Sequence, residues 1–187
     1  MTALVAEHHV GLCGDRTRAS PTPRLSRRDS RMAIIELTTE VAAPIERVFD
    51  LARSIDLHMA STSKTGERAI AGVTSCLIGA GETVTWRARH FGVWQTLTVR
   101  IEAFARPTHF SDVMLRGAFK HMVHHHHFSS SSRGTTMRDA LEFQAPLGVL
   151  GRMVDALVLK SYMRSFLIER NRVIKATAET EAWRHYL

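Results

Sequence analysis

The chain has 187 residues, of which 44% are apolar and 23% are charged, and its net charge is +7. This many apolar residues can form a buried core, so the composition excludes a chain that is disordered throughout, and two cysteines exclude a disulfide framework. Stable membrane insertion is also excluded, because the longest apolar stretch, at residues 146–159, contains two glycines, an arginine and an aspartate and is shorter than the roughly 20 apolar residues of a span.

Residues 1–31 differ in composition from the rest of the chain. They hold six arginines and three acidic residues among prolines, serines and threonines, without apolar periodicity. Such a segment cannot bury enough surface to offset the entropy of ordering it, so we expect a disordered N-terminal extension. An alternative that stays open is that residues 1–31 are an upstream extension that results from a start codon assigned too early. The extension carries +3 of the net charge, which leaves an ordinary +4 for residues 32–187.

The folded part begins with a strand and two short helices. Residues 34–41 alternate between apolar and polar side chains, which is typical of a strand with one wet face. Pro44 follows at a position that suits the first turn of a helix, and an apolar stripe continues to Ala52. Ser54 and Asp56 are suited to cap a second short helix that runs through Met59.

A run of strands and one long helix complete the chain. Glycine-punctuated segments with strand character lie at 67–71, 82–90, 93–103, 110–115, 119–128 and 135–143, and their short connections predict an antiparallel meander. The pattern of residues 147–179 then predicts one long helix. The predicted class is α+β with a helix-grip arrangement, in which a curved sheet of about six or seven strands wraps around the C-terminal helix. We expect one domain over residues 32–179 and a C-terminal tail over 180–187.

Alternation assigns each strand an inward face. Arginines on the opposite faces, such as Arg87 and Arg89, must reach water, so the other set points to the interior. The assignment is ambiguous only for residues 110–115, where we choose the side of Phe110. The inward set is Val84, Trp86, Ala88 and His90; Leu97, Val99 and Ile101; Phe110, Asp112 and Met114; Met122, His124, His126 and Phe128; and Met137, Asp139, Leu141 and Phe143.

This interior contains polar groups that are costly to bury unless they hydrogen-bond one another. Four interpretations stay open. The first is a buried network that fixes strand register, and the second is recognition of the polar head of an apolar ligand. The third is general acid–base catalysis, and the fourth is a metal site built on the His-x-His pair. The polar set is Trp86, His90, Asp112, His124, His126 and Asp139.

Other functional classes lack their sequence signals. The chain has no Gly-x-Gly-x-x-Gly or Walker motif for a nucleotide cofactor and no Gly-x-Ser-x-Gly nucleophile motif. Its basic residues are dispersed and have no aromatic platform beside them, which argues against a nucleic-acid partner. His58, on the second short helix, either closes the mouth of the interior space or is an ordinary surface histidine.

Residues 32–179 resemble the START/Bet v 1-like superfamily, in particular bacterial proteins labelled polyketide cyclase/dehydrase or SRPBCC. The resemblance covers roughly 148 of the 187 residues, and the order of elements is its most specific part. It rests on the segments Ala43–Phe49, Ile55–His58, Gly81–Trp86, His90–Gly92, Phe110–Met114, Thr136–Asp139, Ala145–Gly148 and Glu169–Asn171.

The resemblance implies an internal hydrophobic ligand cavity but no single chemistry. We therefore expect a cytoplasmic protein that binds a small hydrophobic or amphipathic ligand such as a lipid, a quinone or a polyketide, without a cofactor and without a metal. A cyclase or dehydratase that uses a His/Asp pair is the alternative, with His90, His124 and Asp139 as the candidate catalytic residues. The predicted ligand-binding residues are Trp86, His90, Asp112, Met114, His124, His126, Asp139 and Leu157.

Overall fold

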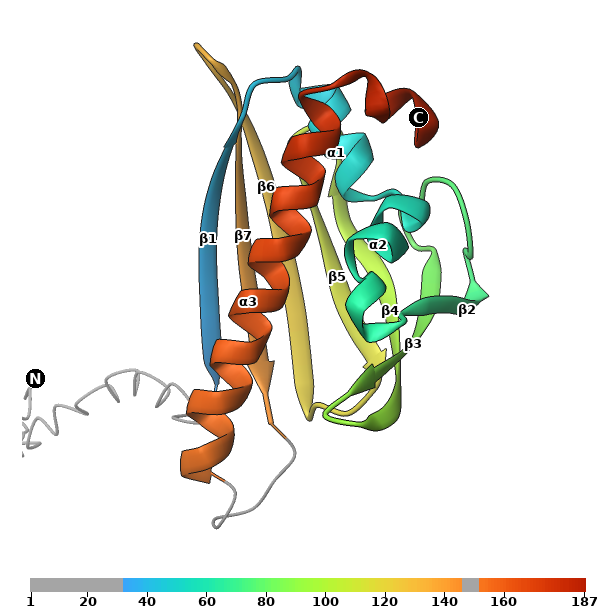
Figure 1. Cartoon of the computed structure of the whole chain (residues 1–187), viewed down its shortest axis with the longest axis vertical. Helices are drawn as coiled ribbons and strands as arrows, with labels where there is room; N and C mark the ends of the chain where they lie inside the picture. The colour runs from blue at the N-terminus through green and yellow to red at the C-terminus, as the bar shows by residue number, and fades with distance from the viewer. Residues whose placement is uncertain (1–31, 146–151) are drawn as a thin grey trace, which may run out of the picture.

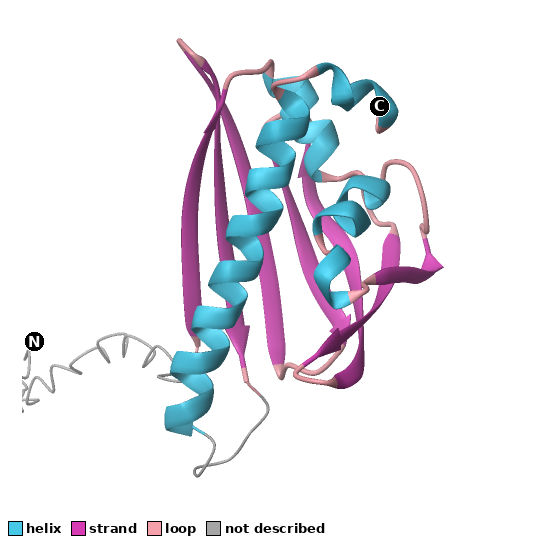
Figure 2. Cartoon of the chain, in the orientation of Figure 1, coloured by secondary structure: helices cyan, strands magenta, loops and turns pink. Residues whose placement is uncertain are grey.

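Seven antiparallel strands form one curved sheet in the order β1-β7-β6-β5-β4-β3-β2 (Figures 1 and 2). The computed structural model describes residues 32–145 and 152–187, and in the second range it describes side chains from Val158 onward. The first strand, β1, pairs with the last strand, β7, and forms one edge of the sheet. The strands are β1 (Ala33–Val41), β2 (Arg68–Gly72), β3 (Thr83–His90), β4 (Val93–Ala105), β5 (His109–Arg116), β6 (His121–Ser131) and β7 (Gly134–Gln144).

Two short helices follow β1, as the sequence predicts. Helix α1 (Ile45–Ala52) begins directly after Pro44, which fixes the backbone dihedral of its N-terminal flank. Helix α2 (Ile55–Ser61) is capped by Ser54, whose hydroxyl accepts a hydrogen bond from the amide of Leu57 at 3.4 Å. A single 3-10 turn, η1 (Ser63–Thr65), then leads into β2.

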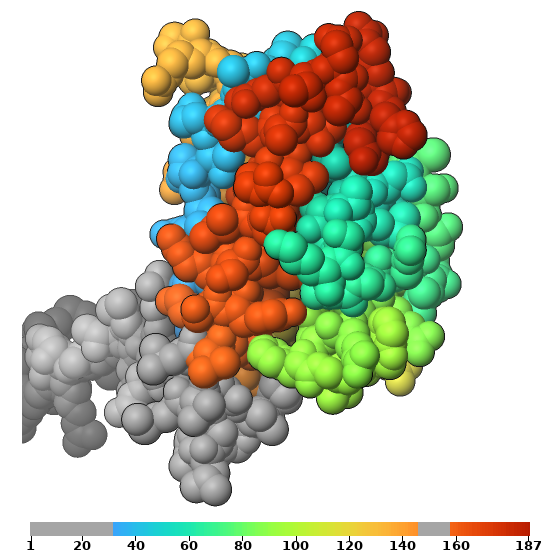
Figure 3. Space-filling view, in the orientation of Figure 1, coloured from blue at the N-terminus to red at the C-terminus, as the bar shows by residue number. Residues whose placement is uncertain are grey.

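The long helix α3 (Arg152–Ala178) lies across the concave face of the sheet (Figure 1). Its described part begins at Arg152, and the predicted start at residue 147 lies outside the described residues. Its last turns are anchored in the core by Leu167, Ile174 and Ala178. Figure 3 shows α3 beside α1, α2 and the β3–β4 hairpin on this side of the molecule. Within the described residues, no helix has the length and apolar character needed to cross a bilayer.

Residues 180–187, which are predicted to be a C-terminal tail, contain a second 3-10 helix, η2 (Glu181–His185). Trp183 of this helix packs against the core, and the guanidinium of Arg47 lies over its ring at 4.5 Å from the ring centroid. The burial of apolar surface by the indole and its stacking with the arginine stabilise an ordered conformation of this segment. The described chain is therefore packed onto α1 as far as its C-terminal residues.

The predicted inward faces of the strands are confirmed by burial. In β3, Val84, Trp86 and Ala88 are buried, and in β6 and β7 every second side chain is buried over most of the strand. The ambiguous strand β5 turns Phe110 inward, as chosen. At the α1 end of the sheet, the ring of Phe49 meets three other phenylalanines edge-on at 5.3–5.5 Å: Phe104, Phe110 and Phe128.

Candidate functional site

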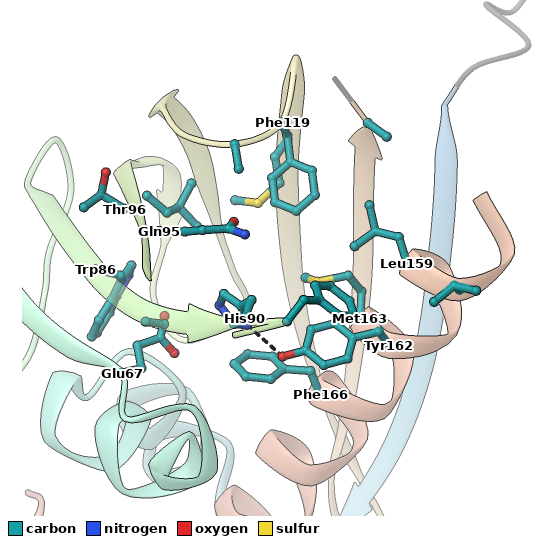
Figure 4. Close-up of a pocket in the computed structure, with 17 residues that line it drawn as sticks. Glu67, Trp86, His90, Gln95, Thr96, Phe119, Leu159, Tyr162, Met163 and Phe166 are labelled. Atoms are coloured by element: carbon teal, nitrogen blue, oxygen red, sulfur yellow. Dashed lines mark hydrogen bonds between the residues drawn. The ribbon is translucent and has the colours of Figure 1, made fainter. Parts of the chain in front are cut away.

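A cavity of about 390 Å³ lies between the sheet and the first described turns of α3, away from the phenylalanine cluster. Cavities of this size and of mainly apolar lining are typical of small-molecule sites. Figure 4 shows side chains from the sheet on one side and from α3 on the other. The lining residues are Glu67, Trp86, Ala88, His90, Phe91, Gln95, Thr96, Leu97, Ala118, Phe119, Met122, Ala145, Val158, Leu159, Tyr162, Met163 and Phe166.

Strand alternation and helical periodicity together produce this lining. Trp86, Ala88 and His90 are successive inward positions of β3. On α3, Val158, Tyr162 and Phe166 recur every four residues, with Leu159 and Met163 beside them, so one face of the helix meets the cavity. Aromatic rings supply much of the wall, which suits a flat apolar ligand.

A histidine–tyrosine pair lies at one side of the cavity. The Nδ1 atom of His90 and the hydroxyl of Tyr162 are 2.7 Å apart, and Figure 4 marks this hydrogen bond. Burial lowers the pKa of His90 and outweighs the nearby negative charge of Glu67, which raises it. The imidazole is therefore neutral at neutral pH and has one donor and one acceptor nitrogen.

Glu67 brings a buried carboxylate to the same side. The residue is 7% exposed, and its Oε2 accepts a hydrogen bond from Nε2 of His58 at 3.1 Å. The His58 ring in turn stacks on Trp86 with ring centroids 4.1 Å apart. Burial by itself would raise the pKa of Glu67, but the charge and the hydrogen bond of His58 lower it overall. Glu67 is thus an ionised group inside a mainly apolar cavity.

A second group of polar residues forms a buried network between strands β5, β6 and β7 and helix α3. Asp139 is its centre: Oδ1 accepts from Nε2 of His124 at 3.0 Å and from Nδ1 of His126 at 2.8 Å, and Oδ2 accepts from Nδ2 of Asn171 at 2.7 Å. The other ring nitrogen of His126 lies 3.3 Å from Oδ2 of Asp112. We call these five residues, together with Arg170, the polar network.

Sheet register explains how the polar network assembles. His126 is paired with Asp139 across β6 and β7, and Asp112 is paired with His124 across β5 and β6. Directly paired side chains of an antiparallel sheet lie within about 5.5 Å, and diagonal neighbours lie within about 8 Å. His126 and Asp139 are direct partners, whereas the His124–Asp139 and His126–Asp112 hydrogen bonds join diagonal neighbours. Arg170 and Asn171 then enter from α3, and Nη1 of Arg170 lies 3.7 Å from Oδ1 of Asp139.

The pKa shifts in the polar network describe a charge-balanced cluster. Burial would raise the pKa of Asp139, but hydrogen bonds from His124 and His126 hold it well below its usual range. Burial would lower the pKa of His126, but hydrogen bonds to Asp112 and Asp139 raise it overall. For His124, burial and the charge of His126 lower the pKa to about 4. Both ring nitrogens of His126 face carboxylate oxygens, so both act as donors and the ring is a cation. Together with Arg170 it faces two carboxylates, while His124 is neutral at neutral pH.

The structure divides the sequence-predicted site residues into separate places. Trp86 and His90 line the main cavity. Asp112 lines a second cavity of about 40 Å³, which also touches Trp86, His58 and Arg170.

The remaining predicted residues lie elsewhere. His124, His126 and Asp139 are buried in the polar network and are not among the described residues that line the main cavity. Met114 packs against the core. Leu157 belongs to α3, but its side chain lies outside the described residues.

Asp112, His124 and His126 also have the composition of a metal site. Each offers a ligand atom, and these atoms lie within 4.8 Å of one another. A cation there would displace the proton that His126 shares with the two carboxylates, and it would lie close to the guanidinium of Arg170. The donor set could therefore hold a divalent ion only at the cost of the charge balance just described.

Of the three titratable residues in the described lining of the main cavity, the sequence indicates His90 and gives no prediction for Glu67 and Tyr162. Glu67 follows Gly66, which has a left-handed backbone (φ 64°) at the end of η1, and in the sequence it looks like the first residue of a solvated strand. Tyr162 shares its helical face with Leu159 and Phe166, a spacing that equally predicts ordinary core packing. The four-residue spacing of aromatic side chains was the available signal for Tyr162, and Glu67 has none.

No protein-family model and no curated protein matches the chain. Solved structures do. The aromatase/cyclase Zhui from Streptomyces sp. R1128 superposes with a TM-score of 0.64 at 17% identity, over 79% of this chain and 94% of that chain. Major latex-like protein 151 from Panax ginseng gives 0.58 at 14% identity, over 80% and 99%. A protein of Thermus thermophilus gives 0.60 at 17% identity, over 79% and 99%.

These similarities, at such low identity, establish the fold. The molecule is a helix-grip α+β protein with a long C-terminal helix held by a curved antiparallel sheet. It shares this fold with the aromatase/cyclase and with the latex-like protein, and the helix-grip arrangement that the sequence predicts is confirmed.

Proposed function

We propose that this protein binds a small hydrophobic or amphipathic molecule in the main cavity, between the sheet and α3. The observation that carries the proposal is the cavity itself, about 390 Å³ of space with an aromatic and aliphatic wall. Interiors of proteins are normally filled to the density of organic crystals, so a space of this size favours an occupant. The fold of the structural relatives supports the same interpretation.

The polar residues in the wall favour a ligand with an apolar body and one polar head. Glu67, His90 and Tyr162 lie on one side of the cavity, whereas Phe119 and Leu159 lie farther along it (Figure 4). A few polar groups in an apolar pocket fix the orientation of a ligand, because a misplaced polar head would leave its own groups and theirs unpaired.

Extraction of the purified protein with organic solvent, followed by mass spectrometry, tests the proposal. We expect a stoichiometric hydrophobic molecule in the extract of the wild type. Ala88, which is buried in the cavity wall, offers the blocking variant Ala88→Phe, because a phenylalanine there fills the space that the ligand needs. The variant should lose the extracted molecule.

Thr85→Phe is the matched control, because Thr85 lies on the same strand and its side chain points to the other face of the sheet. It introduces the same ring outside the cavity and should keep the molecule. Repeatedly empty wild-type protein, or equal retention by both variants, would contradict the proposal.

An enzyme of cyclase or dehydratase type is the second candidate, favoured by the acid–base groups Glu67, His90 and Tyr162 in the cavity wall. A neutral imidazole joined to a phenol can move a proton to or from a bound substrate. The variant His90→Gln separates the two functions. An enzyme would leave unconverted substrate in the variant, so the molecules extracted from the variant and from the wild type would differ in mass. A carrier would yield the same molecule from both.

A further inference from the structure

Glu67 sets the electrostatic character of the main cavity. Among the described residues that line it, Glu67 alone carries a formal charge at neutral pH, and arginine and lysine are absent from that lining. Binding sites for carboxylate or phosphate heads are built with cationic side chains or converging amides, because a buried anion needs charge-assisted donors. The described wall of the main cavity instead carries an anionic side chain, Glu67, and no cationic one.

One oxygen of Glu67 is already used and the other is left for a ligand. Oε2 accepts the hydrogen bond of His58 at 3.1 Å. Thr62 is a second hydrogen-bonding side chain beside this carboxylate, but its hydroxyl already donates to the carbonyl oxygen of His58 at 3.0 Å. Within the described part of the chain no other group donates to Oε1, although Glu67 is 7% exposed and lines the cavity. A buried carboxylate oxygen is a strong acceptor that favours a donor from whatever fills the space beside it.

The His90–Tyr162 pair complements that acceptor in either arrangement of its protons. When the phenol donates to Nδ1 of His90, Nε2–H remains as a free donor and the phenol oxygen as an acceptor. When Nδ1–H donates to the phenol oxygen, the phenol proton is free and Nε2 becomes the acceptor. Both arrangements leave one donor and one acceptor, which is what a hydroxyl group needs as its partner.

We propose that the cavity selects neutral, hydroxyl-bearing molecules with a flat apolar body, and that it rejects the corresponding carboxylates. The ligand hydroxyl donates to Oε1 of Glu67 and accepts from the His90–Tyr162 pair, on the side of the cavity where Figure 4 shows these residues together. The aromatic lining packs against the body of the ligand. This assignment rests on the proposed function, since it specifies the ligand class of the same cavity.

Three pyrene probes that share one body and differ in the head test the selectivity. They are 1-methylpyrene, 1-pyrenemethanol and 1-pyrenecarboxylic acid, the last an anion at neutral pH. Affinities are measured by fluorescence titration of the full-length protein after removal of extractable molecules. We expect 1-pyrenemethanol to bind at least about tenfold more tightly than the carboxylate, because like charges brought together in a site repel strongly.

The variant Glu67→Gln should reduce that ratio to less than about threefold, since it removes the repulsion and keeps the shape of the side chain. Glu36→Gln is the matched control, because Glu36 is exposed on β1 and its substitution removes the same charge outside the cavity. The control should preserve the wild-type ratio. Thermal unfolding of both variants verifies that they are folded, and Tyr162→Phe, which should weaken 1-pyrenemethanol but not 1-methylpyrene, tests the site a second time.

The outcomes separate this inference from the proposed function. If none of the three probes bound to the wild type or to Ala88→Phe, the proposed function would be contradicted. Binding of 1-methylpyrene that Ala88→Phe abolishes, together with equal affinity for the alcohol and the carboxylate, would leave the cavity as a ligand site and overturn the selectivity. A selectivity that persists unchanged in Glu67→Gln would also overturn it, since the charge would then have no part in the discrimination.

Discussion

The two halves of the space between the sheet and α3 are occupied in different ways. Around Phe49 and Asp139 the space is filled by interlocking rings and by the polar network, whose groups pair with one another. Around His90 and Tyr162 the walls stay apart and enclose a cavity. The same helix and sheet thus serve stability at one end and, in our proposal, binding at the other, so mutations at the two ends should have separable effects.

Loss of the central carboxylate should have the largest effect on stability. Asp139→Ala leaves the buried cations His126 and Arg170 with Asp112 as their one remaining counter-charge in the polar network. It also removes the acceptor of His124 and the closer of the two acceptors of Asn171. We expect the free energy of unfolding to fall by about 3–5 kcal/mol, as measured by urea denaturation. Arg138→Ala, on the exposed face of the same strand, is the control and should change it by less than about 0.5 kcal/mol.

Truncation of an aromatic ring should distinguish the filled half from the hollow half. Phe49→Ala removes a fully buried ring with three aromatic neighbours, which should cost about 3–4 kcal/mol of unfolding free energy. Phe166→Ala removes a ring from the wall of an existing cavity and should cost less than about 1.5 kcal/mol, because fewer packing contacts are lost. Equal losses in the two variants would contradict the division into two halves.

The polar network should make stability depend on pH with opposite signs on the two sides of about pH 6.5. The raised pKa of His126 stabilises the folded state below the unfolded pKa, and this contribution is lost as the pH rises through the folded pKa. The pKa of His124, lowered to about 4, has the opposite effect on stability. At pH values between about 4 and the unfolded pKa of about 6.5, the unfolded chain binds a proton at this residue and the folded chain does not. Stability should therefore fall by up to about 1.4 kcal/mol per pH unit from this residue as acid is added.

Comparison with His124→Asn isolates this contribution, because His90 and the carboxylates also affect the acid limb. Asparagine keeps a donor for Asp139 and does not titrate. Urea denaturation at a series of pH values between about 7 and 5 should show a shallower decline for the variant than for the wild type. Parallel curves would mean that His124 is protonated equally well in the folded and the unfolded state.

The smallest effect on stability should accompany a clear effect on binding. Tyr162→Phe removes a partly exposed hydroxyl whose partner His90 can turn to a ligand or to water, so the unfolding free energy should change by less than about 1 kcal/mol. Affinity for 1-pyrenemethanol should fall by about threefold to tenfold. Such a variant sharpens the comparison, because Asp139→Ala is expected to impair the fold far more than it impairs the choice of ligand.

Much of the fold follows from local patterns. Alternation along β3 places Trp86 and His90 inward, because successive side chains of a strand must point to opposite faces. The same reasoning places His124, His126 and Asp139 in the interior, where their polar groups need hydrogen-bond partners. Pattern alone could not say whether they meet a ligand, a metal or one another, since that depends on which side chains arrive from α3.

The sequence by itself thus determined the order of elements, the faces of the strands and the presence of buried polar groups. Only the tertiary structure decided which of these groups share a site. His90 and Tyr162 are 72 positions apart and form one hydrogen bond, and Asn171 reaches Asp139 across 32 positions. Periodicity fixes the direction of a side chain within its own element. The distance between helix and sheet, and therefore the line between filled core and open cavity, is set by how all the elements pack together.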